Sequence, residues 1–328
     1  MKNYKIIKTL IIFLLIILST SYNVASNNNS KTIYVDVDGG KEYKSIKNAI
    51  ENATSGDTIF IYNGIYYEHF TINKSINLIG ENKEKTIIQH NISKYDNYLI
   101  KIIADKVKIS GFKIKGSIYN TAENNPILPL PNDYTGIIIE SDNNEIKNNN
   151  IFDNLGYGLI LNNSENTILS NNTITKCYTS GIYLKNSSKN IITDNNITNN
   201  NIGITFFLNS IDNILYHNNF INNTYYNILS EDNNIFYNYT LKQGNYYYDY
   251  HGTDKNNDGI GDTPYNISEE KYKDLYPIMS PYNGRIVIKE FYVDQDAVIF
   301  MLWIAMIVTI VFLIPIAYIW YRKTRPYK

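Results

Sequence analysis

An all-β solenoid in the form of a parallel β-helix is the fold class that the sequence predicts, and two repeats carry this prediction. Short segments that begin with glycine recur at intervals of 22, 23 and 22 residues, at Gly136–Ile139, Gly158–Leu161, Gly181–Leu184 and Gly203–Phe206. An asparagine recurs every 23 residues, at Asn149, Asn172, Asn195 and Asn218. A unit of about 23 residues is too short to bury its own apolar side, so neighbouring units must stack on one another.

Residues 57–250 are expected to supply the coils. Apolar and polar residues alternate there over short runs that Gly and Asn interrupt, which is typical of strands and shows no helical periodicity. Coils of about 22–24 residues would give roughly eight or nine turns, with equivalent residues about 4.8 Å apart. The asparagine column is interpreted as a ladder at a turn, where side-chain amides bond between coils. Cys177 shares a column with Asn154, Asn200 and Asn223 and is interpreted as a packed thiol.

The segment before the coils, residues 27–56, is predicted to hold a strand and a short capping helix. Apolar residues at helical spacing follow a serine at the N-cap position, and these residues are Ser45, Ile46, Ala49, Ile50 and Ala53. The helix is expected to cover the first coil, because the open end of a solenoid would otherwise pair with other strands.

The two ends of the chain predict a membrane-anchored surface protein. Residues 1–26 have the basic start, apolar stretch and small-residue end of a secretory signal, and both cleavage and retention as an anchor stay open. Residues 298–320 carry no charge and would span about 34 Å as a helix, enough to cross a membrane. Basic residues crowd the tail 321–328, so the positive-inside rule places it in the cytoplasm. A stalk at 284–297 would then join the membrane helix to an extracytoplasmic body, in type I topology.

Composition argues against several functions. Thirty Lys and Arg against 31 Asp and Glu give a formal net charge of -1, which leaves no basic excess for a nucleic-acid partner. The single cysteine, Cys177, excludes an intramolecular disulfide framework and a zinc site built on several thiolates.

Several segments resemble known families. The predicted capping helix, the segments Gly56–Ile59, Gly64–Tyr66 and Ile76–Gly80, and the Asn-rich coils resemble the pectin-lyase-like right-handed β-helices. Three later segments are similar to the terminal signature of the NosD family (periplasmic copper-binding protein NosD), and these are Gly244–Tyr250, Gly259–Tyr265 and Tyr276–Met279. The resemblance implies a right-handed coil that ends in a terminal motif at 251–283. It also implies three kinds of activity, namely polysaccharide cleavage, copper delivery to an extracytoplasmic enzyme, and surface binding.

The residues offer little for polysaccharide cleavage. Glycoside hydrolysis uses paired carboxyl groups, and the motifs that hold them in polygalacturonases are absent from this sequence. One column at 23-residue spacing holds Asn148, Asn171, Asp194 and His217. Asp194 and His217 are therefore expected about 4.8 Å apart and are the catalytic candidates. The alternative is a solvent-facing ladder position that polar side chains fill.

Copper is not an expected cofactor, because copper delivery needs soft ligands or clustered imidazoles. Between the two apolar ends the chain has few such residues, namely Cys177, Met279, His69, His90, His217 and His251. Calcium is the better candidate, in a loop whose ligands would be Asp254, Asn256, Asp258, Ile260 and Asp262. The same loop is also explained as a tight turn without a metal.

A binding surface is the remaining interpretation. If the first and third residues after each glycine face inward, the residues between them form an outward column with unusual apolar content, namely Ile138, Ile160, Tyr183 and Thr205. Tyr-rich stretches such as Tyr246–Tyr250 could stack on sugar rings, although biased composition also explains single tyrosines. The interruption Ile118–Asp133 is interpreted as an inserted loop that could carry recognition.

Glycosylation is predicted from the Asn-x-Ser/Thr sequons of the extracytoplasmic body. The candidates are Asn52, Asn73, Asn91, Asn162, Asn186, Asn196, Asn222, Asn238 and Asn266, with a further sequon at Asn171.

The sequence thus predicts a non-catalytic surface module at the cell membrane that binds carbohydrate or cell-envelope proteins. A polysaccharide hydrolase or lyase on the same fold is one alternative. An accessory factor for an extracytoplasmic copper enzyme is the other.

Overall fold

The computed structural model describes residues 30–89, 97–116, 134–268 and 271–283. They belong to one compact unit, Met1–Asn283. Several predicted segments lie outside the described residues, namely the signal at 1–26, the stalk at 284–297, the membrane helix at 298–320, the tail at 321–328 and the loop Ile118–Asp133. Among the described residues, no helix has the length and apolar character needed to cross a membrane.

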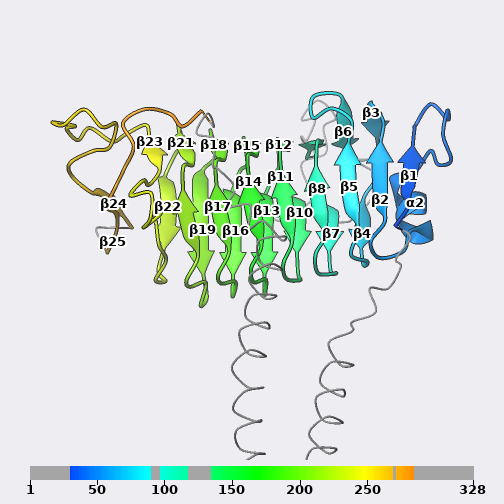
Figure 1. The fold of residues 1–328 in the computed structure, drawn as a ribbon, viewed down its shortest axis with the longest axis horizontal. Coiled ribbons are helices and arrows are strands. Elements are labelled where there is room, and N and C mark those ends of the chain that lie inside the picture. The colour runs from blue at the N-terminus through cyan, green and yellow to red at the C-terminus, as the bar shows by residue number, and fades with distance from the viewer. Residues whose placement is uncertain (1–29, 90–96, 117–133, 269–270, 284–328) are drawn as a thin grey trace, which may run out of the picture. The chain divides into compact units, whose positions relative to one another are not determined.

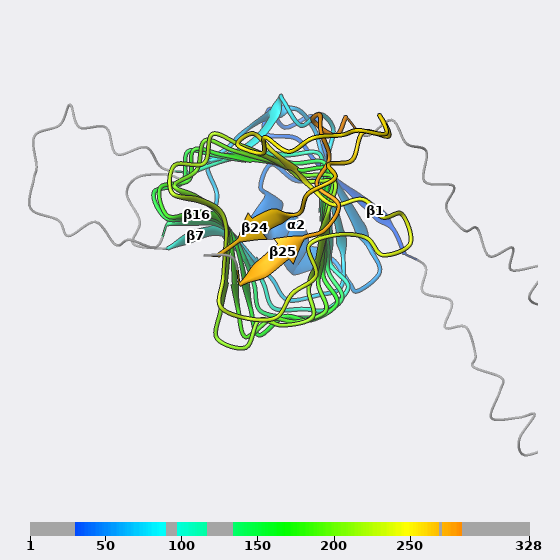
Figure 2. The ribbon, with the colours of Figure 1, turned by 90° about the vertical axis from the view of Figure 1, so that its left-hand side faces the viewer.

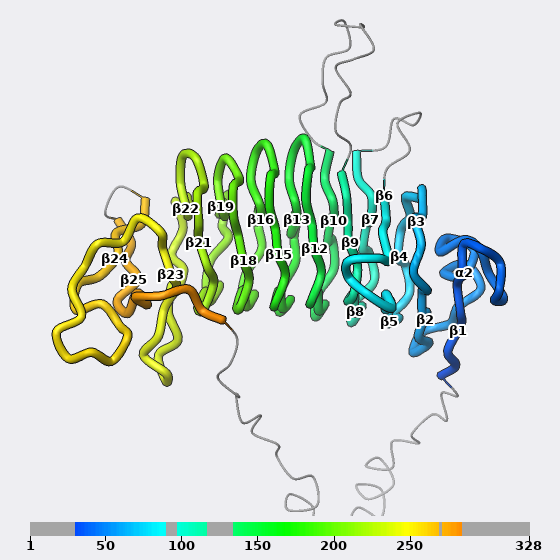
Figure 3. The backbone as a smooth tube through the Cα atoms, turned by 90° about the horizontal axis from the view of Figure 1, so that it is seen from above, coloured from blue at the N-terminus to red at the C-terminus, as the bar shows by residue number. Residues whose placement is uncertain are grey.

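The chain winds into a solenoid of parallel strands (Figure 1), and the end-on view shows its coils stacked around a common interior (Figure 2). Each coil visits three sheets in turn, which we name A, B and C. The sheets hold eight, eight and seven strands, so the solenoid has about eight coils. The predicted parallel β-helix is therefore confirmed, and Figure 3 shows the regular stacking of its coils.

Each sheet takes one short strand from nearly every coil. Sheet A consists of β1 (Thr32–Val35), β2 (Thr58–Ile61), β5 (Asn77–Gly80), β8 (Lys108–Ser110), β11 (Glu145–Lys147), β14 (Ile168–Ser170), β17 (Ile191–Thr193) and β20 (Ile214–Tyr216). Sheet B consists of β3 (Gly64–Tyr66), β6 (Thr86–Gln89), β9 (Lys113–Lys115), β12 (Asn150–Phe152), β15 (Thr173–Thr175), β18 (Asn196–Thr198), β21 (Asn219–Ile221) and β23 (Tyr246–Tyr247). Sheet C consists of β4 (Phe70–Ile72), β7 (Tyr98–Ile102), β10 (Thr135–Ile139), β13 (Tyr157–Asn162), β16 (Ser180–Lys185), β19 (Ile202–Phe207) and β22 (Tyr226–Ser230).

The chain turns sharply between sheets A and B, and two residues make the turn. The first adopts a left-handed backbone and the second points inward, as Asn171 (φ 53°) and the buried Asn172 show. Short polar side chains such as Asn tolerate this backbone region better than β-branched ones. This requirement explains why polar residues, Asn above all, recur at the first position.

The inward asparagines form a hydrogen-bonded column, which we call the asparagine ladder, of Asn149, Asn172, Asn195, Asn218 and Asn245. In each step the Oδ1 atom accepts the backbone N–H and the side-chain amide of the preceding coil. For example, the backbone nitrogen of Asn172 lies 2.9 Å from Asn195 Oδ1 and its Nδ2 atom lies 3.1 Å away. The backbone N–H of each rung thus donates toward the C-terminal end, whereas the Nδ2 atom also donates back to a carbonyl oxygen of the preceding coil, as from Asn195 to Leu169.

The recurring glycines stand at the start of the sheet C strands because successive coils approach closely there. A Cβ atom on Gly158 would lie 2.6 Å from the carbonyl oxygen of Gly181, and one on Gly181 would lie 2.8 Å from that of Gly203. Neither partner is a side chain that could move aside, so these positions admit only glycine without a shift of the backbone.

A short helix, α2 (Ile46–Asn52), closes the N-terminal end, as predicted. Ile46, Ala49 and Ile50 are buried against the first coils. The Glu68 carboxylate accepts the N–H groups of Ile46 and Lys47 at 3.0 and 2.9 Å, and Ser45 caps Asn48. These contacts satisfy amides that have no partner inside the helix.

The C-terminal end is closed by an aromatic stack and a two-stranded hairpin, β24 (Tyr265–Ile267) and β25 (Tyr272–Asp274). The rings of Phe220, Tyr247 and Tyr265 lie one above another, with centroids 5.3 and 3.7 Å apart. Asp274 ends the asparagine ladder, because its Oδ2 atom accepts the backbone N–H of Asn245 at 2.7 Å. A carboxylate suits this position, since the ladder delivers donors and needs an acceptor at its end.

Candidate functional site

Strand alternation brings the four predicted binding residues together on the outer face of sheet C. Ile138 pairs with Ile160, Ile160 with Tyr183, and Tyr183 with Thr205 in the parallel register. The same row continues at both ends, and we call the whole row the outer column: Thr71, Lys101, Ile138, Ile160, Tyr183, Thr205 and Leu229. Its residues are half-buried, except that Thr205 is 9% exposed.

Aromatic rings gather at the centre of the outer column. The Tyr183 ring lies 4.9 Å from the Tyr157 ring and 6.1 Å from the Phe207 ring, measured between centroids. Burial raises the pKa of Tyr183, so its hydroxyl keeps its proton at neutral pH and can donate a hydrogen bond. Ring faces beside a hydroxyl donor suit a ligand that has both apolar and hydroxyl surfaces.

Polar groups lie in the outer column at Lys101 and beside it at Glu140 and Asn162. Lys101 Nζ lies 2.8 Å from the Glu140 carboxylate, and Asn162 Nδ2 donates to the same residue at 3.3 Å. The hydrogen bond from Lys101 lowers the pKa of Glu140, so this carboxylate stays ionised. Sheet C therefore presents apolar rings beside fixed hydrogen-bonding groups.

The catalytic candidates Asp194 and His217 lie in the turns between sheets A and B, on a different part of the coil. His217 Nδ1 lies 3.5 Å from Asp194 Oδ1, and His217 Nε2 lies 2.8 Å from Gln243 Oε1. Asp194 and His217 are therefore neighbours, as expected, and their side chains lie closer together than the expected spacing of the coils.

The alternative of a solvent-facing position is wrong for His217, whose side chain is 1% exposed. The ring of Tyr282 stacks on the imidazole, with centroids 3.8 Å apart and an interplanar angle of 14°. Tyr282 is held in place by Asn219, which accepts its N–H at 2.7 Å and donates to its carbonyl at 2.8 Å. The imidazole therefore lies beneath Tyr282, whereas the Asp194 side chain is 22% exposed.

The predicted calcium loop is closed by its own hydrogen bonds. The Asp254 carboxylate accepts the N–H groups of Asp258 and Gly259, and Asp262 accepts that of Lys255. In the described ranges, no three His, Cys, Asp or Glu side chains are placed to hold one metal ion. The loop as arranged is explained by a turn, and calcium at Asp254, Asn256, Asp258, Ile260 and Asp262 stays a prediction.

The described residues do not fit a copper site either. Cys177 is buried, and burial raises the pKa of its thiol to about 12, so it stays protonated. His217 is covered by Tyr282. His69 and His251 belong to no cluster of three metal-binding side chains among the described residues, and His90 lies outside them.

The structure separates the sequon asparagines from those of the asparagine ladder, which the sequence could not do. Most sequon asparagines are exposed, namely Asn52, Asn73, Asn171, Asn186, Asn196, Asn222 and Asn266. Asn162 and Asn238 are half-buried, and Asn91 lies outside the described residues. Every described candidate for glycosylation therefore lies at least partly at the surface.

Two contacts in the structure had no signal in the sequence. Tyr282 covers His217 from 65 residues farther along the chain, and Glu68 caps a helix 22 residues earlier. The separation of Tyr282 from His217 does not match the repeat. That of Glu68 from Ile46 is one coil, but neither residue belongs to a repeated motif.

Comparisons with known proteins agree with this geometry. The model of the family described as "Periplasmic copper-binding protein (NosD)" matches residues 50–252. Among curated proteins, none matches the sequence.

Solved structures with similar folds include enzymes that act on pectin. A pectin methylesterase from carrot shares 14% identity over 58% of this chain and 62% of its own, with a TM-score of 0.43. The pectate lyase Pel9A shares 15% identity over 58% of this chain and 53% of its own, with a TM-score of 0.47. ORF18 of Geobacillus virus E2 shares 18% identity over 68% of this chain and 43% of its own, with a TM-score of 0.39. This chain thus spans less than two thirds of each of these structures, and the likeness says nothing of activity.

Proposed function

We propose that this chain, which belongs to the NosD family, is a surface module that binds carbohydrate along the outer column of sheet C and does not cleave it. The observation that carries the proposal is the register that sets Ile138, Ile160, Tyr183 and Thr205 side by side, the first three at half-buried positions. Sugars offer apolar ring faces and hydroxyl groups, and this face offers rings, hydroxyls and a charged edge to meet them.

A rigid scaffold supports binding of an extended polymer. Equivalent positions of successive coils recur about every 4.8 Å, so a linear glycan could contact several coils with repeated interactions. Because the parallel strands fix the side chains in advance, little conformational entropy is lost on binding.

Localisation at the cell membrane is part of the same proposal and rests on the sequence of the two ends. A signal at 1–26 and a membrane helix at 298–320 would place the solenoid outside the cell. Protease treatment of intact cells should then remove the solenoid and leave the tail 321–328 protected. Protection of the solenoid would contradict this topology.

The first test is a screen of the full-length chain against an array of cell-envelope polysaccharides, with product analysis of every bound glycan. The proposal expects retention without shortened or unsaturated products. Cleavage products would replace it with a hydrolase or lyase.

The enzyme alternative rests on one observation, the 3.5 Å contact between Asp194 and His217. If this pair were catalytic, Asp194→Asn would abolish product formation while binding remained. We expect that neither the wild type nor Asp194→Asn releases product, because Tyr282 covers the imidazole.

The calcium and copper alternatives are tested by metal titration of the full-length chain. Calcium binding at the Asp254–Asp262 loop predicts that CaCl₂ raises the unfolding temperature of the wild type but not of Asp258→Ala. A role in copper delivery predicts copper that stays bound through dialysis. We expect no retained copper, because the described ligands are covered or scattered.

A further inference from the structure

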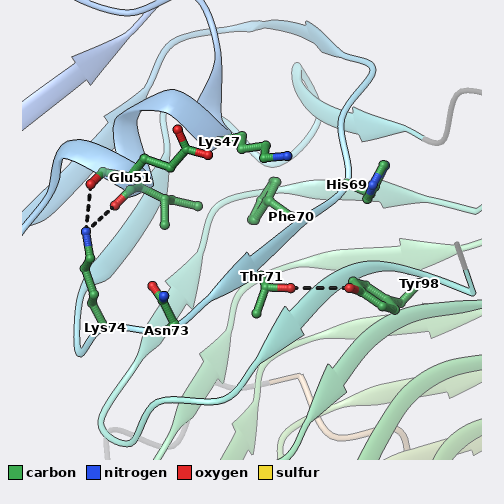
Figure 4. A pocket seen from close by; sticks show the side chains of 9 residues that line it. Lys47, Glu51, His69, Phe70, Thr71, Asn73, Lys74 and Tyr98 are labelled. Carbon is green, nitrogen blue, oxygen red and sulfur yellow. Dashed lines mark hydrogen bonds between the residues drawn. The ribbon is translucent and has the colours of Figure 1, made fainter.

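A cavity of about 410 Å³ lies where helix α2 meets the outer face of sheet C (Figure 4). Helix α2 contributes Lys47 and Glu51, the segment around β4 contributes Thr71, Asn73 and Lys74, and β7 contributes Tyr98. His69 also lines the cavity. We call this cavity the end pocket.

The end pocket owes its shape to a helix that stands where later coils have a strand. In the chain, α2 lies between β1 and β2 of sheet A, just as β4 lies between β2 and β5. It contacts β4, the first strand of sheet C. A helix with its side chains is about 10–12 Å across, whereas neighbouring strands lie about 4.8 Å apart. Helix α2 therefore takes up more room along the solenoid than a strand would, and the pocket lies where it meets β4.

The floor of the end pocket is continuous with the outer column. Thr71 pairs with Lys101, and Lys101 pairs with Ile138. The hydroxyl groups of Thr71 and Tyr98 lie 3.3 Å apart and both face the pocket (Figure 4). A ligand that follows the outer column toward the N-terminal end therefore arrives in this pocket and meets α2.

The charges of the end pocket nearly cancel. Lys74 Nζ donates to the carbonyl oxygens of Ile50, Glu51 and Ala53 at 3.1, 2.8 and 2.7 Å, so it serves to cap the C-terminal end of α2. The remaining ammonium of Lys47 is offset by the carboxylate of Glu51 on the same helix face. Such a pocket favours a group rich in hydroxyls over an ion.

We propose that the end pocket receives the terminal ring of an uncharged linear glycan whose following rings lie along the outer column. The proposal rests on the proposed carbohydrate-binding function. It adds that the glycan lies on the outer column in one direction, with one of its ends in the end pocket. Since sheet C ends at β4, where α2 packs against it, the proposal places the end of the glycan there. Lys47, Glu51 and the Thr71 and Tyr98 hydroxyls supply its hydrogen-bond partners.

The test uses the full-length chain and three uncharged hexasaccharides, of β-linked glucose, mannose and N-acetylglucosamine. Each is offered unlabelled, with a bulky fluorophore on its reducing end, and with the same fluorophore on its non-reducing end. An end pocket predicts that one of the two labels weakens binding by about tenfold or more while the other is tolerated. Equal affinity for both labelled forms would overturn the proposal, because a groove open at both ends tolerates either label.

Variants separate the end pocket from the outer column. Lys47→Ala and Glu51→Ala lie on the exposed face of α2, where alanine preserves the helix. Each substitution should weaken the affinity for the hexasaccharide about three- to tenfold and reduce the difference in affinity between the two labelled forms. Asn48→Ala, on the same helix outside the pocket, is the matched control and should change neither.

The possible failures are distinguishable. If Tyr183→Ala weakens binding but Lys47→Ala and Glu51→Ala do not, the end pocket is wrong and the proposed function stands. If no glycan binds in either the hexasaccharide test or the polysaccharide screen, both proposals fail.

Discussion

Asparagine serves two purposes at neighbouring positions of each coil, and its side chain explains both. At the first turn position it tolerates a left-handed backbone, as Asn148 and Asn171 do. At the second position its amide both donates and accepts hydrogen bonds, so the same residue type can connect each coil to the next throughout the ladder. The 23-residue asparagine repeat could therefore be interpreted correctly from the sequence, whereas its acceptor at the far end, Asp274, could not.

Replacement of Asn195 by alanine tests the asparagine ladder. The change removes the acceptor of the buried Asn172 N–H and the donor to Leu169 O, while Asn172 Nδ2 keeps its hydrogen bond to Ile146 O. We expect a loss of about 3 kcal/mol in the free energy of unfolding, measured by urea denaturation. Asn266→Ala, at an exposed position of β24, should change it by less than about 0.5 kcal/mol. Similar losses in both variants would mean that the ladder contributes nothing specific.

Asp274 gives the solenoid a dependence on pH. Burial raises the pKa of this carboxyl to about 7, although four donors, from Asn245, Tyr247 and Tyr276, contact it. The pKa of Asp274 is higher in the folded chain than in the unfolded one. The contribution of this carboxyl to the free energy of unfolding is therefore complete below about pH 4 and is lost as the pH rises through about 7. Stability should therefore fall by about 2 kcal/mol between pH 5 and pH 7.

The measurement is the unfolding free energy at several pH values for the wild type and for Asp274→Asn. The variant cannot ionise at this position, so the fall between pH 5 and pH 7 should be much smaller. An unchanged slope would show that another group titrates in this range.

Helix α2 owes its position to side chains of the next coil more than to its own sequence. With only seven residues, it is too short to be stable alone in water. Glu68 satisfies its first amides and Lys74 its last carbonyls. The apolar spacing of Ile46, Ala49 and Ile50 made the helix predictable, but these two caps come from beyond it and had no local pattern.

Glu68→Ala should therefore loosen α2 without unfolding the coils. The amides of Ile46 and Lys47 and the hydroxyl of Ser45 would lose their carboxylate acceptor, at a cost of about 1–2 kcal/mol. Hydrogen exchange should accelerate at Ile46 and Lys47 while protection in β13 and β16 is unchanged. Glu42→Ala, at an exposed position before the helix, is the control. Uniform acceleration in both variants would contradict a local role for Glu68.

At the scale of the whole molecule, repetition made most of the fold predictable. A constant interval fixes which residues lie side by side, so the row Ile138, Ile160, Tyr183 and Thr205 followed from counting alone. Contacts that break the repeat did not follow from it. Tyr282 on His217 and the helix beside Thr71 and Tyr98 both arise at the ends of the solenoid, where the period no longer applies.

The most direct test of carbohydrate binding is the affinity of Tyr183→Ala for the glycan that the wild type retains. Tyr183 is the ring at the centre of the outer column, and its loss should weaken binding about tenfold or more while the fold is kept. Tyr34→Ala, which removes an exposed ring on sheet A, is the matched control and should bind like the wild type. Equal affinity of Tyr183→Ala and the wild type would contradict the assignment of the outer column as the binding surface.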